Sequence, residues 1–267
     1  VAGLSRVSTG MLEETAVNTL VDRMTREGFV VLPTVCGDAL LQQFMDAARQ
    51  RIDEVMAVPA SREIGIGSAA GYLEIVQRSP GRWDLPISPR RFGVRDSELP
   101  WWPLVVAILG ADAEHSFSGV VFSEPGSPAQ EWHIDSPHVD VEHRPPHALN
   151  VLMALHDIPL AMGPTEMART SHLMTNHLRY PNLNRDQLVY QSSGTSPETL
   201  AGCAQLATPE RWVEPLAAGS CLVFDDRILH RGLANHSDRA RYVVYFSYRK
   251  SGYAENTHFE SQHSVFG

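Results

Sequence analysis

A histidine and an aspartate two residues apart form the strongest chemical signal in the sequence. His133 and Asp135 follow Gln130-Glu131-Trp132, a run typical of a β-strand. Residues i and i+2 of a strand face the same side, so the imidazole and the carboxylate would converge on one point. A second histidine on a neighbouring strand would complete a set of two histidines and one carboxylate. That set holds Fe(II) and leaves coordination positions open.

Two further His-x-Asp triplets occur in contexts that favour loops. His138 directly follows a proline and leads into an acidic, proline-rich run, and His236 lies in Asn-His-Ser-Asp, which is typical of a turn. Prolines also prevent a helix from aligning His138 with His143 and His147 as zinc ligands. We therefore favour His133 as the metal ligand, and His138 is a candidate substrate contact beside the metal.

The sequence from Gly219 to Tyr248 holds a second histidine and an arginine. It is typical of a strand, a turn, His230, another turn, and a strand that begins with Arg241. An arginine at the start of a core strand needs an anionic partner, and its planar guanidinium suits a carboxylate bidentately. Arg239 is the alternative because it shares strand parity with Arg241. A dicarboxylate cosubstrate would need this pattern, with one end on the metal and the other on the arginine.

These motifs resemble the phytanoyl-CoA dioxygenase family of Fe(II)/2-oxoglutarate-dependent oxygenases, from about residue 29 to residue 248. The matching segments are His133-x-Asp135, Gly163-Pro164-Thr165-Glu166 leading to Ser171-His172, and His230 followed after eleven residues by Arg241. Two positions depart from the family pattern. Arg169-Thr170 stands where Pro-Gly often precedes the Ser-His. Gly232 stands where a serine is common, which removes one possible hydrogen bond to the cosubstrate.

The resemblance implies a double-stranded β-helix, which is a jelly-roll or cupin-like barrel. It implies Fe(II) held by His133, Asp135 and His230, with 2-oxoglutarate and O2 as cosubstrates. Arg241 would bind the distal carboxylate of 2-oxoglutarate, and the side chains that help to hold the cosubstrate would be Gln130 and Thr165. Related halogenases carry a small residue in place of the carboxylate ligand, so the presence of an aspartate disfavours halogenation.

The elements that must position these residues indicate a mainly β fold with flanking α-helices. We expect one domain over residues 1–267, with N-terminal helices in 8–56, a lid-like segment in 57–100 and the barrel core in about 115–250. The stretch 182–211 is polar and weakly patterned, which favours an excursion over the mouth of the barrel. The expected core strands are rich in Val, Phe, Tyr and Leu and cover Ser116–Ser123, Glu131–Asp135, Ala148–His156, Ser220–Phe224 and Tyr242–Tyr248.

The lid-like segment carries the candidate substrate contacts. Glycines and prolines interrupt its periodicity, and long irregular segments of this kind are often lids or binding loops. Its aromatic side chains favour an apolar or amphiphilic small molecule, and its arginines could bind a carboxylate or phosphate on that molecule. The alternative is a surface loop with incidental aromatics. The candidates are Tyr72, Trp83, Arg90 and Phe92.

Composition excludes several other classes. The chain has 267 residues and a net charge of −9, which argues against nucleic-acid partners. No run approaches the ~18 apolar residues of a membrane span, so we expect no membrane partner. Three cysteines without a CxxC pair disfavour a disulfide framework or a cysteine-ligated zinc site, and they fit a cytoplasmic location. The oligomeric state stays open, with a homodimer among the options.

We therefore predict an oxygenase that hydroxylates an unactivated C–H bond of a small molecule and converts 2-oxoglutarate to succinate and CO2. A natural-product intermediate is favoured over an acyl-CoA, because no cluster of Lys and Arg marks a CoA site. Desaturation or epoxidation are other outcomes of the same chemistry. Two rival hypotheses are a zinc-dependent hydrolase with the same ligands and a non-catalytic barrel that binds a metal or a small ligand. Arg241 argues against both, since neither needs a buried guanidinium there.

Overall fold

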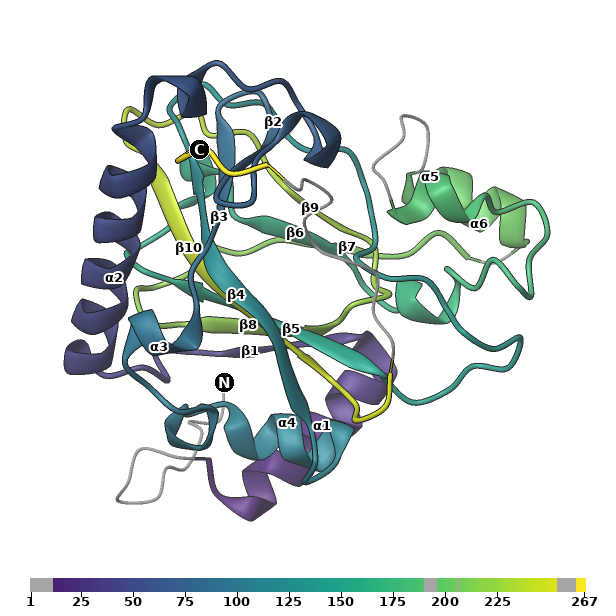
Figure 1. Ribbon diagram of the computed structural model, residues 1–267. Coiled ribbons are helices and arrows are strands. Elements are labelled where there is room, and N and C mark those ends of the chain that lie inside the picture. Colours follow the sequence, from purple (N-terminus) through teal and green to yellow (C-terminus); the bar gives the residue numbers. More distant parts are fainter. Residues whose placement is uncertain (1–11, 190–195, 206, 254–262) are drawn as a thin grey trace.

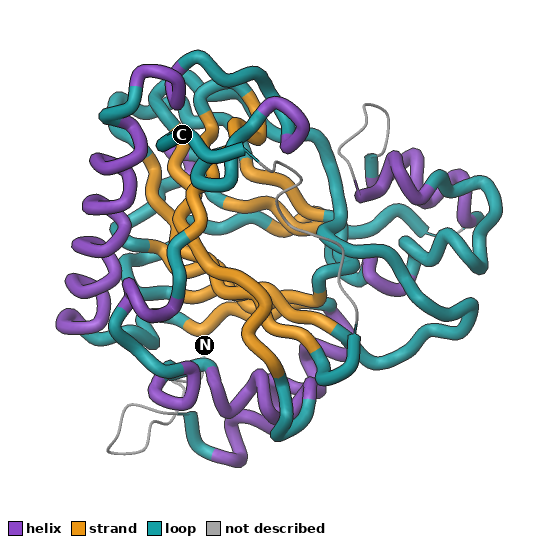
Figure 2. The backbone as a smooth tube through the Cα atoms, viewed as in Figure 1, coloured by secondary structure: helices purple, strands orange, loops and turns teal. Residues whose placement is uncertain are grey.

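Two antiparallel β-sheets form the centre of the protein (Figures 1 and 2). The computed structural model describes residues 12–189, 196–205, 207–253 and 263–267. The large sheet has the strand order β1-β8-β5-β10-β4-β3-β2, and the small sheet has the order β7-β6-β9. The strands of the large sheet are β1 (Phe29–Leu32), β2 (Val76–Ser79), β3 (Arg82–Pro86), β4 (Glu114–Ser123), β5 (Ala148–Ala154), β8 (Cys221–Asp225) and β10 (Arg241–Arg249). Those of the small sheet are β6 (Thr165–Ala168), β7 (Arg211–Trp212) and β9 (His230–Gly232).

Helices cover the outer face of the large sheet, with α2 lying along it in Figure 1. The α-helices are α1 (Glu14–Glu27), α2 (Asp38–Met56), α3 (Pro89–Phe92), α4 (Trp102–Leu109), α5 (Arg185–Val189) and α6 (Pro197–Ala204). α1 is followed by Gly28, whose φ of 84° is the left-handed conformation that glycine adopts without a Cβ penalty. The mainly β architecture with flanking helices is confirmed. None of the described helices is long and apolar enough to cross a membrane.

Alternate residues along each strand of the large sheet face opposite sides. On β3, Trp83 and Leu85 join the hydrophobic core that packs against α2 and α4, whereas Asp84 faces the other way, into a cavity. The same alternation holds on β10, where Val244 lies in the core and Val243 lines the cavity. The large sheet therefore supplies the core with one face and the cavity with the other.

The segment 57–100 is not irregular throughout, as the expectation of a lid assumed. It contains the hairpin of β2 and β3, which extends the large sheet because β3 pairs antiparallel with β4. Gly81, with φ of 68°, supplies the turn of this hairpin. Polar residues interrupt the apolar pattern of β3 because one face of the strand lines a polar cavity. A strand of this kind resembles a loop in the sequence.

The predicted strand at residues 131–135 was also wrong, since only one bridge forms there, between His133 and His230. The short strands of the small sheet were missed because two to four residues are too few to show alternation. Within the stretch 182–211, the structure forms α5 and α6, which lie to one side of the sheets in Figure 1. Arg185 and Val189 of α5 reach the cavity.

Candidate active site

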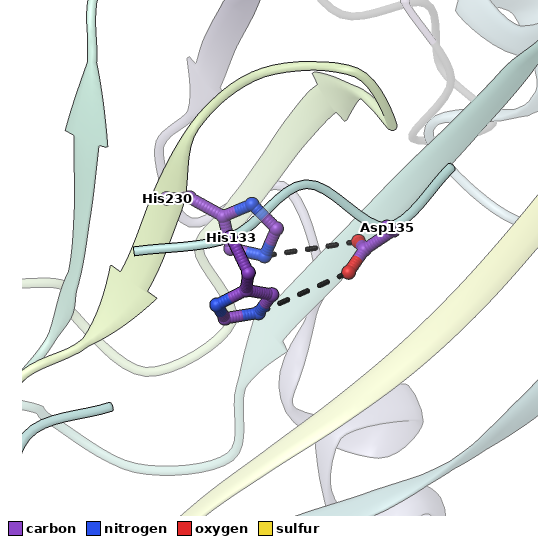
Figure 3. A group of neighbouring side chains, drawn as sticks. All are labelled: His133, Asp135 and His230. Atoms are coloured by element: carbon purple, nitrogen blue, oxygen red, sulfur yellow. Dashed lines mark ion pairs between the residues drawn. The ribbon is translucent and has the colours of Figure 1, made fainter. Parts of the chain in front are cut away.

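The two histidines and the aspartate singled out in the sequence meet at one point (Figure 3). The bridge between His133 and His230 places both imidazoles side by side, with ring centroids 4.4 Å apart. Nε2 of His133 lies 3.9 Å from Oδ1 of Asp135, and Nε2 of His230 lies 3.7 Å from Oδ2. One ligand atom from each residue falls within 4.8 Å of the others. This donor set fits a divalent transition metal bound on one face.

Backbone hydrogen bonds fix the tautomer of both histidines. Nδ1 of His133 lies 2.9 Å from the carbonyl oxygen of Glu131, and Nδ1 of His230 lies 3.1 Å from that of Ile228. A carbonyl only accepts, so each Nδ1 carries the proton and each Nε2 keeps its lone pair for a metal. Burial, and then the neighbouring His230, lower the pKa of His133 to about 4. His133 is therefore neutral at pH 7, as a metal ligand must be.

Asp135 is held from the large sheet. The side-chain amide of Asn150 on β5 donates to Oδ2 of Asp135 at 2.6 Å. Ser247 stands directly opposite Asn150 on β10, and its hydroxyl donates to Oδ1 of Asn150. The amide of Asn150 is thereby oriented with its NH2 group toward the carboxylate.

A cavity of about 590 Å³ lies beside the three residues, between the two sheets. Its walls include one face of the large sheet and parts of β6 and β9 of the small sheet. The predicted site residues that line it are Gln130, His133, Asp135, His138, Thr165, His230 and Arg241. The structure thus brings together the metal-ligand candidates, the cosubstrate candidates and one substrate candidate.

Arg241 lies at the wall of this cavity and is 3% exposed. Its Nη2 donates to the hydroxyl of Ser123 at 3.0 Å, while Nε and Nη1 are buried without a hydrogen-bond partner in the described part of the chain. Burial lowers the pKa of Arg241 to about 10. Unpaired N–H groups on a buried cation are costly, so this end of the cavity fits a carboxylate. Arg239, the alternative, is exposed.

Four of the predicted substrate contacts do not line the cavity, which corrects the prediction. Trp83 and Phe92 are buried in the core behind the large sheet, and Tyr72 packs against the same core. Arg90 is exposed outside the cavity. These side chains were assigned to a lid, but the hairpin and the short α3 place them on the core face or on the outer surface.

A polar cluster that was not predicted from the sequence lies on the cavity face of β2, β3 and β10. Nη2 of Arg78 lies 2.8 Å from Oδ2 of Asp84, and the hydroxyl of Tyr245 donates to Oδ1 of Asp84 at 2.9 Å. Nη1 of Arg78 donates to the hydroxyl of Ser68 at 3.1 Å. All four residues line the cavity. Strand parity is the signal that finds Tyr245, because it stands four residues after Arg241 on the same strand.

His138 offers the cavity a neutral acceptor. Its Nε2 lies 3.0 Å from the hydroxyl of Thr175, and that hydroxyl donates to the carbonyl oxygen of Arg227 at 2.8 Å. Because the proton of the hydroxyl is used there, Nε2 of His138 must be the donor and Nδ1 is left as the acceptor. Burial, and then the charge of Arg227, lower the pKa of His138 to about 3.

Comparison with known proteins agrees with this geometry. The family model for phytanoyl-CoA dioxygenase (PhyH) matches residues 24–243. The non-heme alpha ketoglutarate dependent carbocyclase SnoK from nogalamycin biosynthesis superposes with a TM-score of 0.64 at 18% identity, covering 92% of this chain and 87% of that chain. AviO1 from Streptomyces viridochromogenes gives 0.61 at 17% identity, covering 96% and 100%. HygX from Streptomyces hygroscopicus, with nickel, 2-oxoglutarate and hygromycin B bound, gives 0.60 at 14% identity, covering 92% and 95%.

These structures share the cupin-like fold, so the predicted double-stranded β-helix is confirmed. The family model spans most of the chain, from the last turn of α1 to the first residues of β10. The resemblance first seen in the spacing of histidines, aspartate and arginine is thereby established. The chain belongs to the phytanoyl-CoA dioxygenase family and is an Fe(II)/2-oxoglutarate-dependent oxidoreductase.

Proposed function

We propose that the protein hydroxylates an unactivated C–H bond of a small molecule. One oxygen atom of O2 would enter the product alcohol and the other would enter succinate. 2-Oxoglutarate would lose CO2 in the same reaction. The observation that carries the proposal is the convergence of His133, Asp135 and His230 on one point of a cavity that Arg241 also lines.

The three converging side chains would hold the iron. Bound iron, with 2-oxoglutarate and O2, would supply the oxidising power, and the protein would contribute ligation, orientation and exclusion of water. The Nδ1 hydrogen bonds of His133 and His230 keep both Nε2 lone pairs on the metal side. Asn150 engages one oxygen of Asp135, which leaves the other as the better metal ligand.

The cosubstrate would lie between this centre and Arg241. The unpartnered Nε and Nη1 of Arg241 offer donors for the distal carboxylate. Gln130 and Thr165 line the same cavity and offer hydrogen bonds to the bound cosubstrate. A zinc hydrolase would have no use for a buried, unpaired guanidinium at this place, so Arg241 favours the oxygenase.

The rest of the cavity wall indicates a substrate with apolar and polar parts. Val121, Leu152 and Val243 form an apolar surface, and the Arg78–Asp84 pair, Tyr245 and His138 offer donors and acceptors. We propose a natural-product intermediate as this substrate. The hygromycin B bound to HygX and the nogalamycin RO bound to the epimerase SnoN support a search among such molecules.

An anaerobic titration tests the proposal. We expect the wild type with Fe(II) to develop a visible metal-to-ligand charge-transfer band on addition of 2-oxoglutarate. The band should be absent in Asp135→Ala and should require far more 2-oxoglutarate in Arg241→Ala. A folded, metal-loaded wild type without the band would rule out the oxygenase.

Product mass then identifies the reaction. Candidate natural products are added with O2, and succinate is followed. Hydroxylation and epoxidation each add one oxygen atom, desaturation or ring closure removes two hydrogens, and epimerisation leaves the mass unchanged. The NMR spectrum of the product then separates an alcohol from an epoxide. SnoK and SnoN, named as a carbocyclase and an epimerase, make these alternatives worth measuring.

A further inference from the structure

A second buried arginine stands beside Arg241. In the large sheet, Ser123 of β4 is paired with Arg82 of β3 on one side and with Arg241 of β10 on the other. Residues directly opposite each other in an antiparallel pair have their side chains on the same face. The two arginines therefore flank Ser123 on the cavity side of the sheet. Arg82 is 1% exposed, and it is not among the residues that line the cavity.

Arg82 fixes the orientation of Gln130. Its Nη1 donates to Oε1 of Gln130 at 2.8 Å, and its Nη2 donates to the carbonyl oxygens of Leu233 at 2.9 Å and Pro128 at 3.2 Å. Oε1 of Gln130 also accepts from the backbone N–H of Gly232 at 3.1 Å. An amide oxygen has two lone pairs, so these two donors satisfy it and leave the NH2 group of Gln130 for another partner.

The guanidinium of Arg82 also occupies the place of a side chain at position 232. A Cβ on Gly232 would lie 1.6 Å from Nη1 of Arg82 and 2.8 Å from Oε1 of Gln130. The family often has a serine at this position, and here the guanidinium of Arg82 takes the space of that side chain. The departure from the family pattern at Gly232 thus has a compensating residue on a different strand.

The two guanidinium groups form a buried positive pole. Within the described part of the chain neither makes an ion pair, and Nε of Arg82 has no hydrogen-bond partner. Burial, and then the charge of Arg241, lower the pKa of Arg82 to about 8. Adjacent buried cations without a counter-ion favour the binding of an anion near them.

We propose that Arg82 is a positioning residue for 2-oxoglutarate, turning the NH2 group of Gln130 toward the cosubstrate and adding positive charge beside Arg241. The inference rests on the proposed function, because it concerns the same cosubstrate. Arg82 acts through Gln130 and through its charge, and it needs no direct contact with 2-oxoglutarate.

The space shared by Arg82 and position 232 permits a test by paired variants. The proteins are the wild type, Arg82→Ala, Gly232→Ser and the double variant. Each is loaded anaerobically with Fe(II) and titrated with 2-oxoglutarate, and the charge-transfer band gives the Kd. We expect each single variant to raise the Kd about tenfold, the effect of losing one charge-assisted hydrogen bond. In the double variant the serine fits and can donate to Gln130, so its Kd should lie below that of either single variant.

Controls separate positioning from loss of stability. Fe(II) affinity without 2-oxoglutarate and the Tm are measured for every protein. Arg169→Ala removes another half-buried arginine, which pairs with Glu27 and Glu210 away from the cavity. It should lower the Tm and leave the Kd unchanged. If Arg82→Ala does not fold, Gly232→Ala in the wild-type background displaces the guanidinium locally and should still raise the Kd.

The outcomes distinguish the two proposals. A wild type without the band contradicts the proposed function itself. If the wild type shows the band, the proposed function stands. The role of Arg82 alone is then overturned if the Kd of Arg82→Ala for 2-oxoglutarate, or that of Gly232→Ala in its place, lies within twofold of the wild-type Kd. The role is also overturned if Gly232→Ser is equally harmful with and without Arg82.

Discussion

Asn150 donates its side-chain amide to Oδ2 of Asp135 at 2.6 Å, across the gap between β5 and the loop that carries Asp135. The opposite end of the Asn150 amide is engaged by Ser247 of β10. The carboxylate candidate for the metal is therefore oriented by the large sheet, whereas both histidines are oriented by backbone carbonyls of their own segments. Two independent parts of the fold thus set the geometry of one centre.

Replacing Asn150 by alanine should weaken metal binding. Loss of a partner that orients a metal ligand typically costs about 10- to 100-fold in metal affinity. We expect this loss for Fe(II) in an anaerobic titration of Asn150→Ala, with the fold retained. Ser247→Ala is the matched control, since Ser247 reaches Asp135 only through Asn150, and its effect should be smaller. An Fe(II) affinity of Asn150→Ala equal to that of the wild type would contradict the orienting role.

Arg241 and Arg239 provide a paired test of the cosubstrate end. Arg241 is buried with two unpartnered nitrogen atoms, and Arg239 is exposed in the preceding turn. Arg241→Ala should raise the Kd for 2-oxoglutarate at least about tenfold, because a charged hydrogen bond to the distal carboxylate is lost. Arg239→Ala should bind as the wild type does. The reverse result would move the cosubstrate end to Arg239.

Removing a charge from the buried pair of Asp225 and Arg227 should lower the stability more than removing one from a pair near the surface. Nη2 of Arg227 lies 2.6 Å from Oδ2 of Asp225, and both side chains are 1% exposed. Asp225→Asn leaves a buried guanidinium without its counter-ion, which should cost about 3–5 kcal/mol in the free energy of unfolding. The exposed pair of Asp140 and Arg144 is the control, and Asp140→Asn should change stability little. Urea unfolding at pH 7 measures both, and similar losses in the two variants would contradict the expectation.

Acidification should destabilise the metal-free protein, partly through His138. Its pKa falls from 6.5 to about 3 on folding, because burial and then Arg227 disfavour the imidazolium. Below pH 6.5 the unfolded chain takes up a proton that the folded protein refuses, so stability falls as the pH falls toward 3. This group contributes a slope of about 1 kcal/mol per pH unit between pH 6 and 5.

His138→Gln isolates that contribution. Glutamine keeps a donor for Thr175 but does not titrate. Urea unfolding of the metal-free proteins from pH 7.5 to 5 should show a shallower loss of stability in the variant than in the wild type. Parallel curves would mean that His138 takes up its proton equally in both states.

Long apolar strands and widely spaced motifs were predictable from the sequence. β4, β5, β8 and β10 lie within a few residues of their predicted bounds, because each is a run of five or more residues rich in apolar and aromatic side chains. The candidate ligands and Arg241 were found because the order and spacing of two histidines, an aspartate and an arginine match one kind of site. The structure places these residues around one cavity.

The hairpin of β2 and β3 was not predictable in the same way. Arg82-Trp83-Asp84-Leu85 alternates between charged and apolar residues, yet the charged positions are buried in the cavity face and read as solvent-exposed in the sequence. Asn150 lies inside a strand that was predicted, but nothing local marks it as the partner of Asp135. Its contact depends on the pairing of strands far apart in the chain, which becomes visible only when the sheet is assembled.

The alternation of cavity and core residues along the large sheet has a consequence for how such an enzyme can diversify. Val121, Leu152 and Val243 shape the cavity, while their immediate neighbours Val120, Val151 and Val244 pack against the helices on the other side. A library that varies the first three would change the cavity while keeping the core that packs against the helices, and Val121 is the position with the fewest packing partners, because Leu152 and Val243 also contact smaller apolar clusters on their own face of the sheet. The shape of the cavity and the helix-facing core are thus encoded on the same strands by interleaved positions, so the cavity can diversify while the helix-facing core is kept.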